Sequence, residues 1–192
     1  MDLDFYTADV FTDTVFHGAQ IAVFPDAQGL DAAKMQLIAR GLSLPQTVFV
    51  FPALEDAGGW RIRIFSLLAE VEFGAHGIIA AAFVLASIGA IALPQPHTPV
   101  VLEEKSGPVE LHITRDPKAP ARPMRAQFSM KTRYTIDRFV PAEDEPPAIL
   151  SLTASDLGAP KYSPLIVSCG YPYLIVPLKS YAAARNRQET IE

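Results

Sequence analysis

Residues 75–93 read AHGIIAAAFVLASIGAIAL, and no side chain in this stretch is charged unless His76 is protonated. Small residues alternate with large aliphatic and aromatic ones, so a helix of this composition has no face suited to water. It must be enclosed by protein or by lipid. A predicted strand, Trp60–Phe65, comes shortly before it, and the histidine lies at its start with a small residue on either side.

Lipid is the first environment to consider, because a run of about 18–20 apolar residues is long enough to span a bilayer. Here Ser87 and Gly89 interrupt the run, and Pro94 and Pro96 end it. The chain contains no second segment of this kind. The sequence therefore favours a buried central helix over residues 75–92, enclosed by strands of the same protein.

The composition favours a cytoplasmic protein with a sizeable core. Of the 192 residues, 49% are hydrophobic, and the net charge of -5 argues against a nucleic-acid surface. The N-terminal residues lack the positive start and apolar stretch of a secretory signal. The single cysteine, Cys169, cannot form an internal disulfide, and we expect it to be a small buried hydrophobe rather than a nucleophile.

Strands are predicted on both sides of the apolar helix, which suggests a sheet curled around it. One amphipathic helix, residues 30–40, has Asp31 near its N-terminus. The fold class is therefore α+β, with residues 1–115 forming a first rolled half. The strands expected in this half are Leu3–Phe11, Gln20–Phe24, Thr47–Phe51, Trp60–Phe65, Val100–Glu104 and Val109–Thr114.

A domain boundary is predicted at residues 116–123, where three prolines within eight residues indicate a stiff extended linker. Residues 124–192 contain only short strands and helices, and they read as an incomplete second half. Its apolar strands would be exposed unless covered, so we expect either a homodimer or a separate chain to complete it. These apolar residues are Leu165, Ile166, Val167, Leu174, Ile175 and Val176.

An ordered series of short motifs runs along most of the chain. It comprises Asp9-Val10-Phe11-Thr12, Phe16-x-Gly18-x-x-x-Ala22-Val23, Met35-x-x-Ile38-Ala39-Arg40, Thr47-Val48-Phe49-Val50, Arg61-x-Arg63-Ile64-Phe65, Glu70-x-x-Phe73-x-x-His76 and Val167-Ser168-x-Gly170-x-Pro172-x-Leu174. Together these motifs resemble the PhzF-like isomerases of phenazine biosynthesis.

That resemblance implies the diaminopimelate-epimerase-like fold, in which two rolled halves each surround a central helix and the active site lies in the cleft between them. It also implies an isomerase that needs neither metal nor cofactor and moves a proton on a small carboxylated substrate. Gln46 occupies the position of the family's acid/base glutamate, and His76 matches the family's site histidine. Gly18, Thr47, Ala75 and Gly77 are the implied substrate-binding positions.

The chain departs from the family pattern at Gln46, because an amide cannot transfer protons at neutral pH. Two interpretations follow. Either the protein is an isomerase whose acid comes from elsewhere, or it is a non-catalytic relative, a pseudoenzyme that acts as a binding or partner subunit. Glu72 is one candidate for the missing acid, although Glu70 and Glu72 more often belong to a solvated or salt-bridged turn.

Other kinds of site have little support in the sequence. The four histidines, His17, His76, His97 and His112, lack metal-ligand spacing, so no metal site is expected. No phosphate-binding glycine loop, dinucleotide fingerprint or nucleophile elbow is present. Gly18 and Gly74 are also explained by tight turns and close backbone approach.

Overall fold

The computed structural model forms two compact units, residues 1–130 and residues 131–192, which are described separately. Within the chain, the structure describes residues 2–52, 59–129, 134–137, 145–158, 162–168 and 172–186. Cys169 and Gly170 lie outside the described residues, so the expectation about the cysteine thiol stays a prediction.

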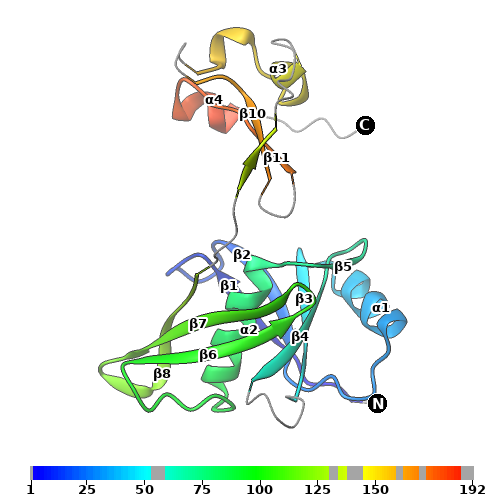
Figure 1. Cartoon of the computed structure of the whole chain (residues 1–192), viewed down its shortest axis with the longest axis vertical. Coiled ribbons are helices and arrows are strands. Elements are labelled where there is room, and N and C mark those ends of the chain that lie inside the picture. The colour runs from blue at the N-terminus through cyan, green and yellow to red at the C-terminus, as the bar shows by residue number, and fades with distance from the viewer. Residues whose placement is uncertain are drawn as a thin grey trace. The chain divides into compact units, whose positions relative to one another are not determined.

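Among the described residues, eight strands of the first unit form one sheet with the order β1-β2-β3-β4-β6-β7-β8, and β5 pairs with β4 (Figure 1). Two pairs, β2 with β3 and β4 with β6, are parallel. Parallel neighbours need a crossover connection, and helices α1 and α2 provide it. The strands are β1 (Tyr6–Val10), β2 (Ala19–Phe24), β3 (Gln46–Phe51), β4 (Trp60–Phe65), β5 (Glu70–Val71), β6 (His97–Glu104), β7 (Gly107–Asp116) and β8 (Ala119–Phe128).

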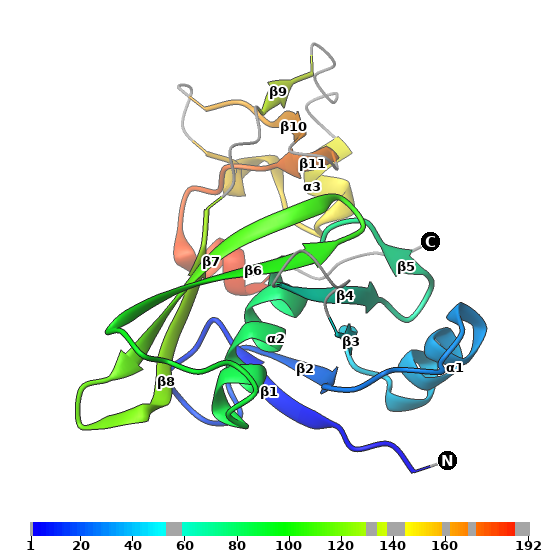
Figure 2. The ribbon, with the colours of Figure 1, turned by 60° about the horizontal axis from the view of Figure 1, so that its bottom comes forward.

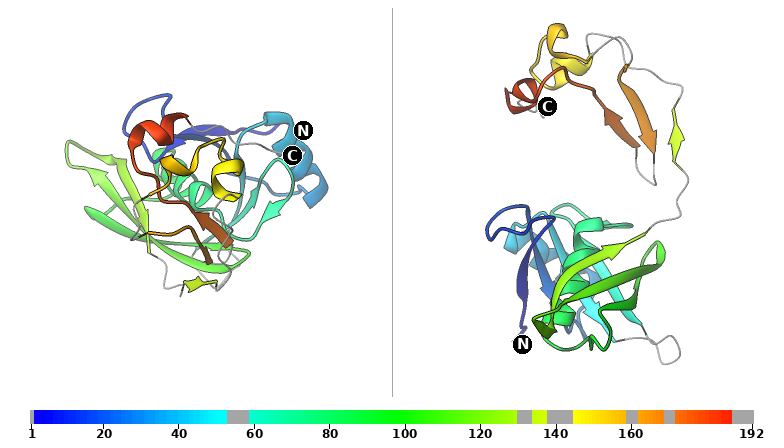
Figure 3. Two further views of the ribbon diagram at one scale, coloured as in Figure 1. Left: turned by 90° about the horizontal axis from the view of Figure 1, so that it is seen from above. Right: turned by 90° about the vertical axis from the view of Figure 1, so that its left-hand side faces the viewer.

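Helix α2 (Ala75–Ser87) lies inside the curl of this sheet (Figures 2 and 3). Ile78 and Leu85 are fully buried, and they pack in one apolar cluster with strand residues such as Val48, Ile64 and Leu111. Small side chains on α2 let the strands approach it closely. The predicted α+β fold, a rolled sheet around a central apolar helix, is therefore confirmed.

Helix α2 ends earlier than the predicted range of 75–92. Ile88 caps it, and Gly89 adopts a left-handed conformation with φ of 78°. Ile91 remains buried after the helix has ended, so the apolar pattern continues beyond the helical geometry. No helix in the described part of the chain is long and apolar enough to cross a membrane.

Helix α1 (Ala32–Leu42) covers the other face of the sheet (Figure 2). Because side chains alternate along a strand, Val48 and Val50 face α2, whereas Phe49 and Phe51 join a second cluster with Met35 of α1. The Asp31 carboxylate accepts a hydrogen bond from the backbone N–H of Lys34 at 2.8 Å, as its predicted capping role requires.

The prediction of a linker at residues 116–123 is wrong. Asp116 and Ala119 pair across a tight turn, and residues 119–128 form β8, an edge strand. An edge strand tolerates proline because one side of its backbone needs no hydrogen-bonding partner. Pro120 and Pro123 therefore belong to the sheet, and the division between the two units falls after Met130.

In the second unit, three described strands form a sheet with the order β11-β10-β9. Tyr173 and Ile175 of β11 are exposed, and whether another chain covers them stays a prediction. The elements of this unit are β9 (Thr135–Ile136), α3 (Glu145–Ile149), η1 (Ala154–Asp156), β10 (Leu165–Ser168), β11 (Pro172–Ile175) and α4 (Tyr181–Asn186).

Candidate active site

Gln46 begins strand β3 and is half-buried. Its Oε1 accepts a hydrogen bond from the backbone N–H of Gly77, in the first turn of α2, at 3.0 Å. Because this partner is a donor, the amide oxygen must face the helix and the amide nitrogen is left to donate elsewhere. The side chain can therefore hold a ligand acceptor, but it cannot carry a proton.

The start of α2 lies very close to the sheet. A Cβ atom at Gly77 would lie 2.9 Å from both Ile64 Cδ1 and Val48 Cγ2, and one at Gly74 would lie 3.0 Å from Gln46 Oε1. The predicted close backbone approach at Gly74 is thus confirmed. Gly74 is also the N-cap residue and has no side chain of its own to cap the helix, so the described side-chain contact in the first turn is the bond from the Gly77 N–H to Gln46. The helix therefore offers backbone N–H groups at an end that favours negative charge.

His76 is exposed in the first turn of α2, next to the half-buried Ala75. Its ring packs edge-on against the ring of Phe11, with centroids 5.1 Å apart and an interplanar angle of 88°. Phe11 is itself 65% exposed and has a φ of 59°. The imidazole is thus held by one aromatic contact and remains accessible to solvent.

Gly18 ends the loop that carries Phe11. Its φ is 75°, and a Cβ atom there would lie 2.3 Å from the carbonyl oxygen of Val10, so only glycine fits. The Asp9 carboxylate fixes the same loop by accepting a hydrogen bond from the backbone N–H of Phe16 at 2.8 Å. The described contacts of Gly18 are those of a tight turn.

Thr47 follows Gln46 on β3, and strand alternation places the two side chains on opposite faces of the sheet. Thr47 is fully buried, and its Oγ1 has no hydrogen-bonding partner among the described residues. The structure therefore brings Gln46, Ala75, His76 and Gly77 together, but it does not bring the Thr47 side chain to them.

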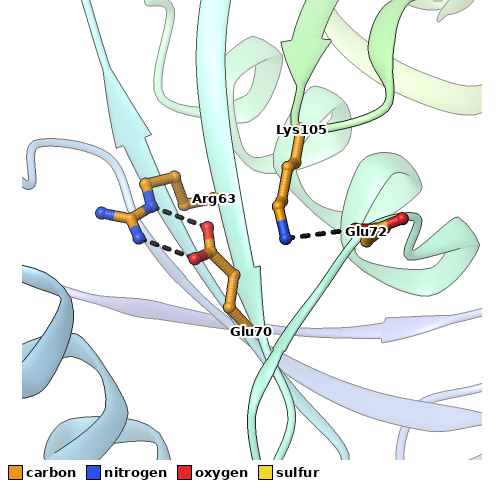
Figure 4. Close-up of polar contacts among 4 residues, drawn as sticks. All are labelled: Arg63, Glu70, Glu72 and Lys105. Atoms are coloured by element: carbon orange, nitrogen blue, oxygen red, sulfur yellow. Dashed lines mark hydrogen bonds and ion pairs between the residues drawn. The ribbon is translucent and has the colours of Figure 1, made fainter.

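Glu70 and Glu72 belong to a salt-bridged turn, one of the two roles considered for them (Figure 4). Both Glu70 carboxylate oxygens accept hydrogen bonds from Arg63 at 2.7 Å, and this pairing lowers the pKa of Glu70. Glu72 lies 3.2 Å from the Lys105 ammonium group. Both carboxylates are therefore paired with a cation.

Glu104, at the end of β6, is a residue that the sequence analysis did not single out. It is half-buried, and its carboxylate accepts hydrogen bonds from Ser106 Oγ at 2.7 Å and from the backbone N–H of Gly74. Burial raises the pKa of Glu104, and the two hydrogen bonds partly oppose that rise. Strand alternation from the buried Leu102 was the signal that could have identified it.

A groove of about 1050 Å³ lies elsewhere in the first unit. It is bounded by the edge strands β1 and β8, and Ile79, Phe83 and Ser87 of α2 contribute to its lining. Gln46 and His76 do not line it. No group of three or more metal-binding side chains occurs among the residues that the structure describes.

Comparison with known proteins identifies the family of this chain. A model of the phenazine biosynthesis-like proteins, PhzC-PhzF, matches residues 8–191. An uncharacterized isomerase of Mesorhizobium japonicum is 33% identical over 92% of this chain and 56% of its own length. Trans-2,3-dihydro-3-hydroxyanthranilate isomerase of Pseudomonas chlororaphis is 36% identical over 40% of this chain and 27% of its own length.

A solved structure has a similar fold. The chain resembles a protein of Pseudomonas aeruginosa described as a predicted epimerase, with a TM-score of 0.81 and 27% identity. The similarity covers 99% of this chain and 64% of that one, so this chain spans roughly three fifths of the length of such relatives. The family match over residues 8–191 shows that the chain belongs to the PhzC-PhzF family of phenazine biosynthesis-like proteins.

Proposed function

We propose that this protein is a PhzF-like isomerase or epimerase that moves a proton on a small carboxylated substrate without a cofactor. The observation that carries the proposal is the hydrogen bond from the Gly77 N–H to Gln46 Oε1, because it fixes an amide donor beside the start of α2. The relatives named as isomerases support the reaction class.

The substrate carboxylate would bind at the first turn of α2. Gly74 supplies no capping side chain, and the N–H groups of a helix start favour an anion. The Gln46 amide nitrogen beside this turn and the exposed His76 imidazole within it can donate further hydrogen bonds. This arrangement holds one end of a substrate and leaves the other end to meet an acid/base group.

Proton exchange with solvent is the direct test. The protein is incubated in D2O with trans-2,3-dihydro-3-hydroxyanthranilate, the compound named in one relative, and deuterium incorporation is followed by mass spectrometry. We expect deuterium at one carbon at a rate that scales with protein concentration. Incorporation no faster than in buffer alone would reject isomerisation of this compound.

A non-catalytic binding protein is the second candidate, and Gln46 is the observation that favours it. An amide at the family's acid/base position keeps the hydrogen-bonding geometry of a carboxylate but loses proton transfer. Under this interpretation the same turn of α2 binds a carboxylate and no carbon–hydrogen bond is broken.

The variant Gln46→Glu separates the two candidates, with Gln127→Glu on the exposed part of β8 as a charge-matched control. If the protein is a binding protein that lost only its base, the wild type exchanges no deuterium and the Gln46→Glu variant gains exchange. An enzyme with its acid elsewhere exchanges deuterium as the wild type. Gln127→Glu leaves either pattern unchanged.

A further inference from the structure

Glu104 and Gln46 meet at the same short piece of backbone. Gln46 Oε1 accepts the Gly77 N–H, and the Glu104 carboxylate accepts the Gly74 N–H. The alpha carbon of Gly74 lies so close to Gln46 that an added Cβ would be 3.0 Å from its Oε1. The two side chains therefore converge on the first turn of α2 from strands β6 and β3.

The direction of Glu104 follows from the strand that carries it. Leu102 is fully buried in the cluster around α2, and residues two apart on a strand share a face. Glu104 continues this face to the end of β6, where α2 begins. Its neighbour Glu103 lies on the opposite face and provides a matched comparison.

The other acidic side chains near this turn are committed to cations. Glu70 is bound by Arg63 through both oxygens, and Glu72 pairs with Lys105. The bonds that Glu104 makes are to the Ser106 hydroxyl and the Gly74 N–H, neither of which is a charged partner. A carboxyl without a cation can be protonated and deprotonated without breaking an ion pair.

We propose that Glu104 is the proton-carrying acid/base of this site and performs the role that Gln46 cannot. This inference rests on the proposed function. The Glu104 carboxylate removes a proton from one substrate carbon, and the electron pair of the broken C–H bond enters the substrate's double-bond system. The resulting carboxylic acid returns the proton to another carbon, so a new C–H bond forms and no oxidant is needed.

Two environmental effects suit Glu104 to this role. Burial raises the pKa of its carboxyl, so the group keeps a proton closer to neutral pH than an exposed glutamate does. The bond from the Gly74 N–H favours the ionised form and limits the rise. The charged and titratable groups on the elements around Glu104 include Glu103 and Lys105 on β6 and the turn after it, Glu70 and Glu72 on β5 and just beyond it, Arg61 and Arg63 on β4, Glu110 on β7 and His76 on α2.

The same shift predicts how a substitution affects stability. A carboxyl whose pKa is raised by folding stabilises the fold below its unfolded pKa, and this stabilisation is lost as the pH rises through the folded value. Glu104→Gln removes the ionisation, so the variant is expected to be as stable at pH 7 as the wild type, or more so. A loss of activity without a loss of stability distinguishes a proton carrier from a structural side chain.

The experiment compares the full chain with Glu104→Gln, Glu104→Asp and Glu103→Gln in the D2O assay with trans-2,3-dihydro-3-hydroxyanthranilate. The expected loss in Glu104→Gln is about 10²-fold or more, the usual contribution of a general acid/base. Glu104→Asp retains part of the rate and shifts its pH profile, and Glu103→Gln stays within about twofold of the wild type. A wild-type rate in Glu104→Gln overturns the proposal.

A second measurement separates failure of this inference from failure of the proposed function. The Glu104 carboxyl is titrated by ¹³C NMR in the wild type and in Gln46→Glu, with Glu104→Gln used to assign its resonance. The inference is supported if the pKa of Glu104 is raised in the wild type and rises further in Gln46→Glu, where a second carboxylate lies nearby. This result supports Glu104 as the proton-holding group of the site even if the wild type exchanges no deuterium. An ordinary pKa that Gln46→Glu leaves unchanged overturns it.

Discussion

The enclosed body of helix α2 and its open first turn are built from different kinds of residue. In the body, Ile78 and Leu85 are fully buried against the sheet, and their side chains have no polar groups that need hydrogen-bonding partners. In the first turn, Gln46 accepts the Gly77 N–H, Glu104 accepts the Gly74 N–H, and the exposed His76 ring packs on Phe11. The body packs against the sheet, whereas the first turn carries the polar groups on which the proposed function rests.

The largest effect is expected in the body of the helix, where Leu85→Ala removes a fully buried side chain. The lost burial and the remaining cavity are expected to lower the free energy of unfolding by about 2–5 kcal/mol. Urea denaturation followed by circular dichroism measures the change. Leu37→Ala on α1 is the control: Leu37 is 65% exposed, so its loss is expected to change stability by less than about 0.5 kcal/mol.

The next effect comes from the boundary between the body and the first turn, where Gly77→Ala adds a methyl group 2.9 Å from Ile64 and Val48. Alanine favours a helix, but the overpacking is expected to lower the free energy of unfolding by about 1–3 kcal/mol.

Gly41→Ala in α1 is the matched control for this substitution, because no atom lies within 4 Å of the added Cβ. It is expected to raise the free energy of unfolding by about 0.5–1 kcal/mol. Opposite signs in the two denaturation midpoints support close packing at Gly77. The same sign in both would mean that the sheet gives way to the methyl group.

The sequence predicted the body of α2 well because burial of a helix leaves a local pattern. The uncharged stretch after His76 required an enclosure, and strands such as Trp60–Phe65 were there to provide it. The end of the helix was placed too late, since apolar residues such as Ile91 stay buried beyond it. In the structure, Gly89 follows the last residues of the helix with a positive φ, and a glycine at this position is the sequence feature that indicates the helix end.

The first turn was harder to predict, because its geometry depends on residues far apart in the sequence. Strand alternation from Leu102 separates Glu104 from Glu103, but only the folded sheet brings its carboxylate to Gly74. Pro120 and Pro123 led to the wrong prediction of a linker because a linker and an edge strand both tolerate residues without a backbone N–H. For Thr47, strand alternation alone placed the side chain away from Gln46.

The salt-bridged turn beside α2 tests whether charges near the first turn contribute to folding. Glu70→Gln is expected to lower the free energy of unfolding at pH 7 by roughly 0.5–1 kcal/mol, because its pair with Arg63 is only partly exposed. The folded pKa of Glu70 is lowered, so this contribution is present above the unfolded pKa and is lost as the pH falls through the folded value.

Denaturation of wild type and Glu70→Gln at a series of pH values checks this sign. The two curves are expected to differ at neutral pH and to converge in acid. Glu72→Gln serves as the control, because the Glu72 and Lys105 side chains are 65% and 53% exposed and their pair contributes less. A difference for Glu70→Gln that persists in acid would show that the Arg63 pair is not its cause.

The smallest effect on stability is expected at the first turn itself, where His76→Gln alters an exposed side chain. The denaturation midpoint is expected to stay within about 0.5 kcal/mol of the wild type, whereas binding of benzoate, a simple carboxylate probe, is expected to weaken about two- to fivefold. His112→Gln on the exposed face of β7 is the control for loss of an imidazole. Benzoate binding is measured by NMR titration. Equal affinity of wild type and His76→Gln would show that His76 does not contribute to anion binding, and its contact with Phe11 would then be the observed role of the ring.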